Sequence, residues 1–278
     1  MDLAALTAVI AVAAATCVAC WVLSLITKDT SWVDRIWSIV PVVYVWIFAG
    51  FAIGAGVDAT RLVVMAVLVT LWGARLTANF ARKGGYAGVE DYRWAILRGR
   101  MTPWQFQLFN VFFIVLYQNA LLVLITLPAF VALQHPTPFG AWDVVWSLLF
   151  VAFLVGELTA DQQQWDFHRA KQRAGGTLEP GFLTTGLFRY SRHPNFFFEQ
   201  AQWWAFYALG AVAASGLGVV GGVLNWSIAG AALLTALFIG STVFTESISA
   251  SRYPAYAEYQ RSTSMLVPLP PRRRRPHA

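Results

Sequence analysis

The sequence predicts an all-α integral membrane protein with seven transmembrane helices, an outside N-terminus and a cytoplasmic C-terminus. The chain has 278 residues, of which 58% are hydrophobic and only 12% are charged. A soluble domain carries about 25% charged residues, so this chain has too few to cover a water-exposed surface. Long apolar stretches recur along it, and its basic residues gather in alternate loops. These three features together indicate a multi-pass membrane protein.

Seven stretches are apolar enough to be spans, each of which needs roughly 20 mostly apolar residues. They are Leu3–Ile26, Ile36–Ile53, Leu62–Phe80, Trp104–Leu133, Trp142–Leu158, Phe196–Leu217 and Trp226–Phe244. The first has no basic n-region and is too long for the apolar part of a signal peptide, so we interpret it as a span. We interpret Cys17 and Cys20 within it as packing or lipid-facing residues. Residues 1–267 are expected to form one membrane domain, and residues 268–278 a disordered basic tail.

The loops alternate in charge. One set of loops carries nearly all the basic residues. The opposite set has Arg61 as its only Lys or Arg, and it consists of the N-terminus, Gly54–Arg61, Gln134–Ala141 and Gly218–Asn225. Basic loops mark the cytoplasmic side, where polar ligands are therefore expected. Arg272–Arg275 form a tail that attracts anionic lipids rather than a nucleic-acid groove. The Ala-rich, Arg-over-Lys composition suggests a bacterial inner membrane, and we expect a monomer.

Several seven-span functions are excluded by residue type. A retinal protein needs a lysine inside a span, but Lys28, Lys83 and Lys171 all lie in predicted loops. The four histidines are far apart, with none of the close spacing that a metal site needs, so no metal is expected. The chain also lacks a glycine-rich phosphate loop.

Ionisable residues at the inner membrane edge are functional candidates, since charge near hydrocarbon is costly. Glu157 and Asp161 are four residues apart and share a helix face near the end of the fifth span. Asp34 precedes the second span and could simply cap it, and Glu246 closes the seventh and could pair with an arginine for structural reasons. For Glu199 we favour a functional role over a structural one, because the residue lies about one turn inside an apolar helix.

The densest polar segment is Gly186–Gln200. In it Arg189, Arg192 and His193 directly precede a helix that is expected to begin near Pro194 or Asn195. Guanidinium groups beside the free N–H groups of a helix N-terminus form an anion site. A basic loop touching lipid head groups is the structural alternative. The polar residues leading into Glu199 favour a phosphate-bearing cofactor.

The segment Gly186–Gln200, followed by Trp203 and Trp204, resembles the C-terminal signature of the steroid 5-alpha-reductase-like membrane oxidoreductases. It is most similar to their bacterial branch, DUF1295. Other segments resemble that branch in the same order: Ser31–Trp37, Leu71–Leu76, Glu90–Trp94, Gly156–Phe167 and Tyr256–Pro268. The resemblance therefore covers nearly the whole chain.

This resemblance implies a seven-helix enzyme that holds NADPH at the cytoplasmic face and reduces a carbon–carbon double bond conjugated to a carbonyl. The substrate would be a hydrophobic enone, sterol-like or polyprenyl-like, entering from the bilayer. Carried over residue by residue, the resemblance assigns the family's cofactor contacts to six residues of this chain: Asp161, Arg189, Arg192, His193, Asn195 and Glu199.

One departure concerns the group that polarises the substrate carbonyl. The steroid-reducing members use a Gln-Glu pair in the second span and a tyrosine in the third, and this chain has neither. Asp34 or Tyr44 could supply the acid, and with Glu199 they are the predicted catalytic residues. Two alternatives remain open: an S-adenosylmethionine-dependent membrane methyltransferase, in which Glu246 would supply the carboxylate, and a lipid-binding protein without turnover.

Overall fold

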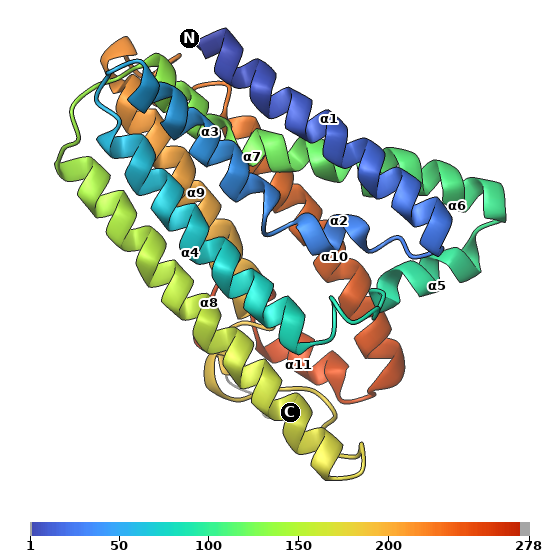
Figure 1. Ribbon diagram of the computed structural model, residues 1–278. Helices are drawn as coiled ribbons and strands as arrows, with labels where there is room; N and C mark the ends of the chain where they lie inside the picture. Colours follow the sequence, from blue (N-terminus) through green and yellow to red (C-terminus); the bar gives the residue numbers. More distant parts are fainter. Residues whose placement is uncertain (1, 273–278) are drawn as a thin grey trace. The chain divides into compact units, whose positions relative to one another are not determined.

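The computed structural model describes residues 2–272, which are built from α-helices (Figure 1). The elements are α1 (Asp2–Thr27), α2 (Trp32–Ile36), α3 (Val40–Gly54), α4 (Thr60–Arg82), α5 (Tyr92–Arg100), α6 (Pro103–Phe109), η1 (Asn110–Tyr117), α7 (Gln118–Gln134), α8 (Ala141–Arg173), η2 (Gly186–Arg189), α9 (Pro194–Ala214), η3 (Ser215–Leu217), α10 (Ile228–Arg252) and α11 (Tyr256–Ser262). Two isolated bridges are the only β pairings in this part of the chain. The predicted all-α class is confirmed.

Five helical segments of the described chain are long and apolar enough to cross a membrane. They are Asp2–Thr27, Thr60–Arg82, Pro103–Gln134, Ala141–Arg173 and Ile228–Arg252. The first has a mean hydropathy of 2.5 in its most apolar window. These segments support a multi-pass membrane protein. The count of seven spans, which adds α3 and α9, and the orientation of the termini stay predictions.

Two helix boundaries differ from the predicted ones. The second apolar stretch becomes helical as α3 only at Val40, because Pro41 has no N–H to donate to the carbonyl of Trp37. Helix α8 continues through 33 residues, about 50 Å, and so carries Lys171 and Arg173, which were expected in a loop. Its polar half consists mainly of good helix formers and contains no proline or glycine.

The chain divides into two compact units. Unit 1 comprises the residues up to Leu148 together with Ala205–Leu233, and unit 2 comprises Leu149–Trp204 together with the residues from Leu234 onward. Helices α8, α9 and α10 each contribute residues to both units.

Glycines allow close helix packing in unit 1. Pro128 in α7 has no N–H, so the carbonyl of Leu124 lacks its usual helical partner. Gly230 of α10 lies against that same carbonyl, where a side chain would collide with the backbone. Gly210 of α9 packs in the same way against Pro128. These two contacts fix the last part of unit 1 onto α7.

A buried ion pair in unit 1 explains the single basic residue of the predicted outer loops. The Nε and Nη2 groups of Arg61 donate to the two carboxylate oxygens of Asp143 at 2.6 and 2.9 Å. The remaining N–H groups of Arg61 donate to the Thr137 carbonyl and hydroxyl and to the Pro138 carbonyl. Gly140 N–H donates to Asp143. Arg61 is thus neutralised internally and joins α4 to α8 and the loop before it.

Candidate functional site

The basic segment of unit 2 begins at a turn that requires glycine. Gly186 has a φ of +62°, and a Cβ there would collide with the side-chain amide of Gln163 on α8. The same amide oxygen accepts a hydrogen bond from the N–H of Leu187 at 2.9 Å. The η2 turn follows, and α9 begins at Pro194, as predicted. Helix α8 therefore sets the point from which the segment runs toward α9.

Glu246 of α10 is the centre of a buried hydrogen-bond network. Arg192 donates to both of its carboxylate oxygens, from Nε at 2.6 Å and from Nη2 at 3.0 Å. His193 Nε2 lies 3.0 Å from Glu246 Oε1, and Gln260 Nε2 donates to Oε2 at 2.9 Å. Tyr256 adds a longer hydrogen bond of 3.4 Å. The predicted structural pairing of Glu246 with an arginine is confirmed.

The C-terminal segment fixes the backbone of the same region. Arg192 Nη1 donates to the carbonyls of Gln260 and Thr263. The Arg192 N–H donates to the Ser264 carbonyl at 2.8 Å, and the His193 N–H donates to the Met265 carbonyl at 3.1 Å. All three guanidinium nitrogens of Arg192 therefore donate to groups within unit 2.

Part of the expected disordered tail takes part in this packing. The N–H of Leu269 donates to the carbonyl of Tyr190 at 2.9 Å, and the N–H of Arg272 donates to the carbonyl of Ser262 at 2.8 Å. The first residues assigned to the tail thus hold the segment that precedes α9. The rest of the tail, residues 273–278, lies outside the described residues.

Aromatic side chains pack beside the Glu246 network. Phe182 packs against Tyr253, Tyr256 and Tyr259, with ring centroids 4.9 to 5.8 Å apart. The hydroxyl of Tyr259 donates to the carbonyl of Phe188. Burial raises the pKa of both Tyr256 and Tyr259, so these two phenols stay neutral hydrogen-bond donors.

Lys171 ties the end of α8 to this aromatic cluster. Its ammonium group donates to the Tyr253 hydroxyl at 2.9 Å and to the Gly181 carbonyl at 3.0 Å. The hydrogen bond from Lys171 holds the pKa of Tyr253 below its ordinary value. The polar extension of α8 thus has a structural role in unit 2.

The carboxylates predicted from helical spacing are buried. Glu157 and Asp161 both lie on α8, 4% and 3% exposed, in agreement with a shared inward face. Glu157 accepts a hydrogen bond from Gln202 of α9 at 2.6 Å. Glu199, 4% exposed, accepts one from Trp203 Nε1 at 3.1 Å. These contacts hold acidic groups on two neighbouring helices in defined orientations.

The six predicted cofactor residues all belong to unit 2, but their environments differ. Asp161 and Glu199 are buried, and Arg192 and His193 lie in the Glu246 network. Arg189, at the end of η2, is exposed, and Asn195 in the first turn of α9 is partly buried. Arg189 is therefore the accessible cation of the group, whereas Arg192 is engaged internally.

The other two predicted catalytic residues belong to unit 1. Asp34 of α2 accepts a hydrogen bond from Trp94 Nε1 of α5 at 3.0 Å. Burial raises the pKa of the Asp34 carboxyl, although this hydrogen bond acts in the opposite direction. Tyr44 of α3 is fully buried, with the side chain of Thr16 on α1 near its hydroxyl.

The sequence predicted the basic segment before α9, but it did not predict the residues that hold this segment in place. Gln260, Lys171 and the tyrosines at 253, 256 and 259 were not singled out. The three tyrosines recur at intervals of three residues, and this regular aromatic spacing is a signal that the sequence itself contains. Within residues 2–272 no group of three or more His, Cys, Asp or Glu side chains is arranged to hold a metal ion.

Comparison with known proteins agrees with the proposed resemblance. A protein of the fission yeast Schizosaccharomyces pombe, described as uncharacterized, is 41% identical over 264 residues, which cover 89% of this chain and 75% of the yeast protein. No solved structure matches the chain. Residues 20–263 match the family described as "Protein of unknown function (DUF1295)". The family match and the yeast relative therefore show that the chain belongs to the DUF1295 family.

Proposed function

We propose that this protein is an NADPH-dependent reductase of a carbon–carbon double bond conjugated to a carbonyl in a hydrophobic substrate. The observation that carries the proposal is the segment from Arg189 to Asn195, whose backbone is fixed by Glu246 and by the C-terminal segment. A fixed basic segment at a helix N-terminus suits a phosphate-bearing cofactor. The family's relation to steroid reductase-like proteins supports the same assignment.

The residues present fit such a cofactor with a division of roles. In the first turn of α9, Pro194 has no N–H and the Phe197 N–H donates to the His193 carbonyl, so the N–H groups of Asn195 and Phe196 are the ones that can face an anion. Arg189 is exposed beside them and can bind a phosphate group through its planar fork. Arg192 and His193 hold the segment in place through Glu246. Asn195 and Glu199 can hydrogen-bond the nicotinamide carboxamide and ribose.

When bound, NADPH would supply the hydride, and the protein's contribution is to orient the substrate and provide a proton. Asp34, whose carboxyl has its pKa raised by burial, is the first candidate for the group that donates a proton or a hydrogen bond to the substrate carbonyl. Tyr44 is the second candidate donor. The substrate would enter from the bilayer, with the protein acting as a monomer.

The proposal is tested by cofactor titration of the purified protein in detergent. We expect NADPH to bind more tightly than S-adenosylmethionine, and the reverse order would favour a methyltransferase. Binding of neither ligand would favour a lipid-binding protein without turnover.

Turnover with a panel of hydrophobic enones, followed through the nicotinamide absorbance, tests the residues. Asn195→Ala and Glu199→Gln should abolish turnover with little change in melting temperature. Asp34→Asn should reduce the rate more than the NADPH affinity. If it lowers only the melting temperature, Asp34 is a structural residue.

A further inference from the structure

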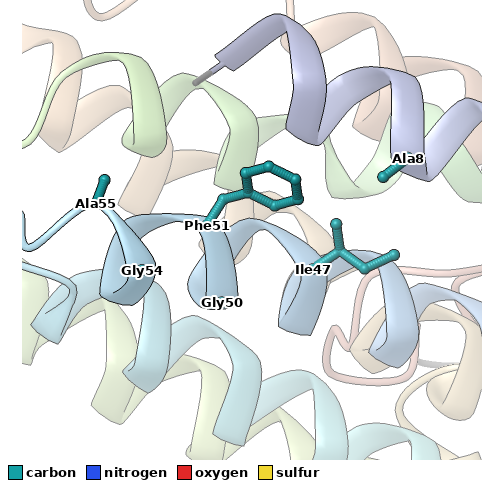
Figure 2. A pocket seen from close by; sticks show the side chains of 6 residues that line it. All are labelled: Ala8, Ile47, Gly50, Phe51, Gly54 and Ala55. Carbon is teal, nitrogen blue, oxygen red and sulfur yellow. The ribbon is translucent and has the colours of Figure 1, made fainter.

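Exposed apolar surface is expected along the helices of unit 1. A groove of about 590 Å³ between α1 and α3 is an example (Figure 2). None of its lining residues has a polar side chain: they are Ala8, Ile47, Gly50, Phe51, Gly54 and Ala55. Helices that cross a bilayer present such surface to lipid chains, so the groove needs no ligand of its own. An apolar loop is different, because connecting segments are normally polar.

The α9–α10 loop (residues 215–227), which belongs to unit 1, is apolar on its outside. Val219 and Val220 are 67% and 83% exposed. Four more apolar side chains of this loop are about half exposed: Leu217, Val223, Leu224 and Trp226. The loop contains no Asp, Glu, Lys, Arg or His. Exposed apolar side chains gathered in this way mark an interaction site for a protein or for a membrane.

The polar side chains of the same loop are buried. Asn225 and Ser227 are 5% and 1% exposed. Asn225 Nδ2 donates to the carbonyl of Gly222 at 2.9 Å, and Asn225 Oδ1 accepts from the hydroxyl and the N–H of Ser227 at 2.6 and 3.0 Å. Tyr207 of α9, which is also buried, donates to the Val223 carbonyl at 2.6 Å. The loop therefore reverses the usual arrangement, in which polar side chains face water.

Backbone polar groups of the loop are paired within unit 1. The N–H groups of Val223 and Leu224 donate to the carbonyls of Gly218 and Val219, at 3.1 and 2.8 Å. The N–H of Gly221 donates to the Leu224 carbonyl at 3.0 Å. The side-chain donors described above pair two further carbonyls of the loop. Internal pairing is what hydrocarbon requires, because a backbone group there has no water to bond.

Glycines make this form of the loop possible. Gly218 and Gly221 have φ angles of +91° and +87°, in the left-handed region that favours glycine. A Cβ on Gly222 would collide with the carbonyls of Gly218 and Ala214. The glycines thus specify a tight turn that leaves the side chains of Val219 and Val220 on the outside.

Three features select lipid rather than protein as the partner of this surface. The loop leads directly into Ile228–Arg252, a segment long and apolar enough to cross a membrane. Trp226 stands just before that segment, and tryptophans at the ends of spans are typical of the membrane interface. A protein interface has a polar rim, whereas this loop has no charged side chain.

We propose that the α9–α10 loop enters the lipid leaflet at its end of α10, with Val219 and Val220 among the hydrocarbon chains and Trp226 at the interface. The partner is the hydrocarbon of a phospholipid leaflet, and not a second copy of the chain or a soluble protein. The loop is then part of the membrane-embedded surface of unit 1 rather than a connection in water. The inference does not depend on the proposed reaction.

The test measures the depth of a nitroxide label in full-length protein reconstituted in phosphatidylcholine vesicles. Val220→Cys is labelled in a background in which Cys17 and Cys20 are replaced by alanine. Electron paramagnetic resonance then compares collisions with oxygen, which concentrates in hydrocarbon, and with a nickel chelate, which stays in water. The label should be severalfold less accessible to nickel than in the control Thr177→Cys, an exposed position in the loop after α8. It should resemble the label in Val243→Cys, an exposed position on α10.

A charge placed on the loop should reverse this result. With the label in Val223→Cys, the added change Val220→Asp should raise nickel accessibility severalfold, because an ionised side chain is costly in hydrocarbon. Val220→Leu is the matched control and should leave the accessibility unchanged. Melting temperatures should agree, since the side chain of Val220 is largely exposed and packs against little of the protein.

Equal nickel accessibility at Val220 and Thr177 would overturn the inference, because the loop would then lie in water, as a surface that awaits a soluble partner does. Protection from both oxygen and nickel, with dipolar broadening between labels, would overturn it in favour of a second copy. Equal accessibility in the Val220→Asp and Val220→Leu variants would also overturn it. These readouts need no NADPH, so the inference and the proposed function fail separately.

Discussion

The buried arginine–carboxylate pairs Arg61–Asp143 in unit 1 and Arg192–Glu246 in unit 2 have nearly the same inner geometry. Arg61 and Asp143 in unit 1 have side chains 5% and 0% exposed, and Arg192 and Glu246 in unit 2 are 8% and 7% exposed. In both pairs the arginine binds both carboxylate oxygens and uses its remaining donors on backbone carbonyls. Both pairs thus meet the condition under which a buried ion pair is tolerated.

The two pairs differ in what else they hold. Asp143 also accepts a hydrogen bond from the backbone N–H of Gly140, so that pair joins α4 to α8 and the loop before it. Glu246 also accepts from Gln260 and lies within hydrogen-bond distance of His193, which directly precedes α9. The same chemical unit therefore stabilises a loop in one place and positions a candidate binding segment in the other.

Glu246→Gln gives the largest expected effect. It removes the charge that pairs with Arg192 while the arginine stays buried, which costs about 3–5 kcal/mol of stability. It also releases the segment before α9, so NADPH binding should be lost in the fraction that remains folded. Unfolding in denaturant and NADPH titration measure the two effects. Wild-type NADPH affinity would show that the Glu246 network does not position the binding segment.

Asp143→Asn is the matched test in unit 1. It leaves Arg61 buried without its counter-charge, so the expected loss of stability is similar, about 3–5 kcal/mol. Because this pair holds α4 and the loop before α8 rather than the segment before α9, the folded fraction should bind NADPH with unchanged affinity. A parallel fall in affinity in both variants would mean that the two pairs do not differ in function.

Arg189→Gln should have the converse effect to Asp143→Asn. Arg189 is exposed, so the free energy of unfolding should change by less than about 0.5 kcal/mol. Loss of one charged hydrogen bond to a phosphate should weaken NADPH binding about ten- to a hundredfold. Calorimetric titration measures this change, with Arg261→Gln on α11, another exposed arginine, as the control. Equal affinities in the two variants would place the phosphates elsewhere.

Much of this comparison was predictable from the residues. Apolar length predicted the helical class, and the position of Pro194 predicted the start of α9. The alternation of charge placed Arg61 as an exception among the outer loops, but its partner lies 82 residues away, a distance that no local pattern encodes. Pairing across such separations depends on tertiary packing. The pairing of Glu246 with an arginine was predicted, whereas the choice of Arg192 was not.

The residues that hold the candidate site in place were less predictable, because they also pair across long sequence separations. Residues 268–278 were expected to be a disordered tail because of their prolines and arginines, yet the backbone N–H of Leu269 donates to Tyr190 and that of Arg272 donates to Ser262. Backbone hydrogen bonds carry no side-chain signature, so composition favoured disorder. Likewise, the complete burial of Tyr44 is a property of its surroundings and not of its position in the sequence.

Glu90→Gln gives the smallest expected effect and extends the comparison to a more exposed pair. Arg98 donates to both carboxylate oxygens of Glu90, but the two side chains are 40% and 21% exposed. Partial burial acts to raise the pKa of Glu90, yet the hydrogen bonds from Arg98 and Thr30 hold it below the ordinary value of 4.5. An exposed pair contributes about 0.2–1 kcal/mol.

A lowered carboxyl pKa stabilises the fold above pH 4.5, and this contribution is lost as the pH falls through the folded-state pKa. The stability difference between the wild type and Glu90→Gln should therefore be present at neutral pH and vanish in acid. A difference that stays constant across this range in melting experiments would mean that Glu90 acts through its shape and not its charge.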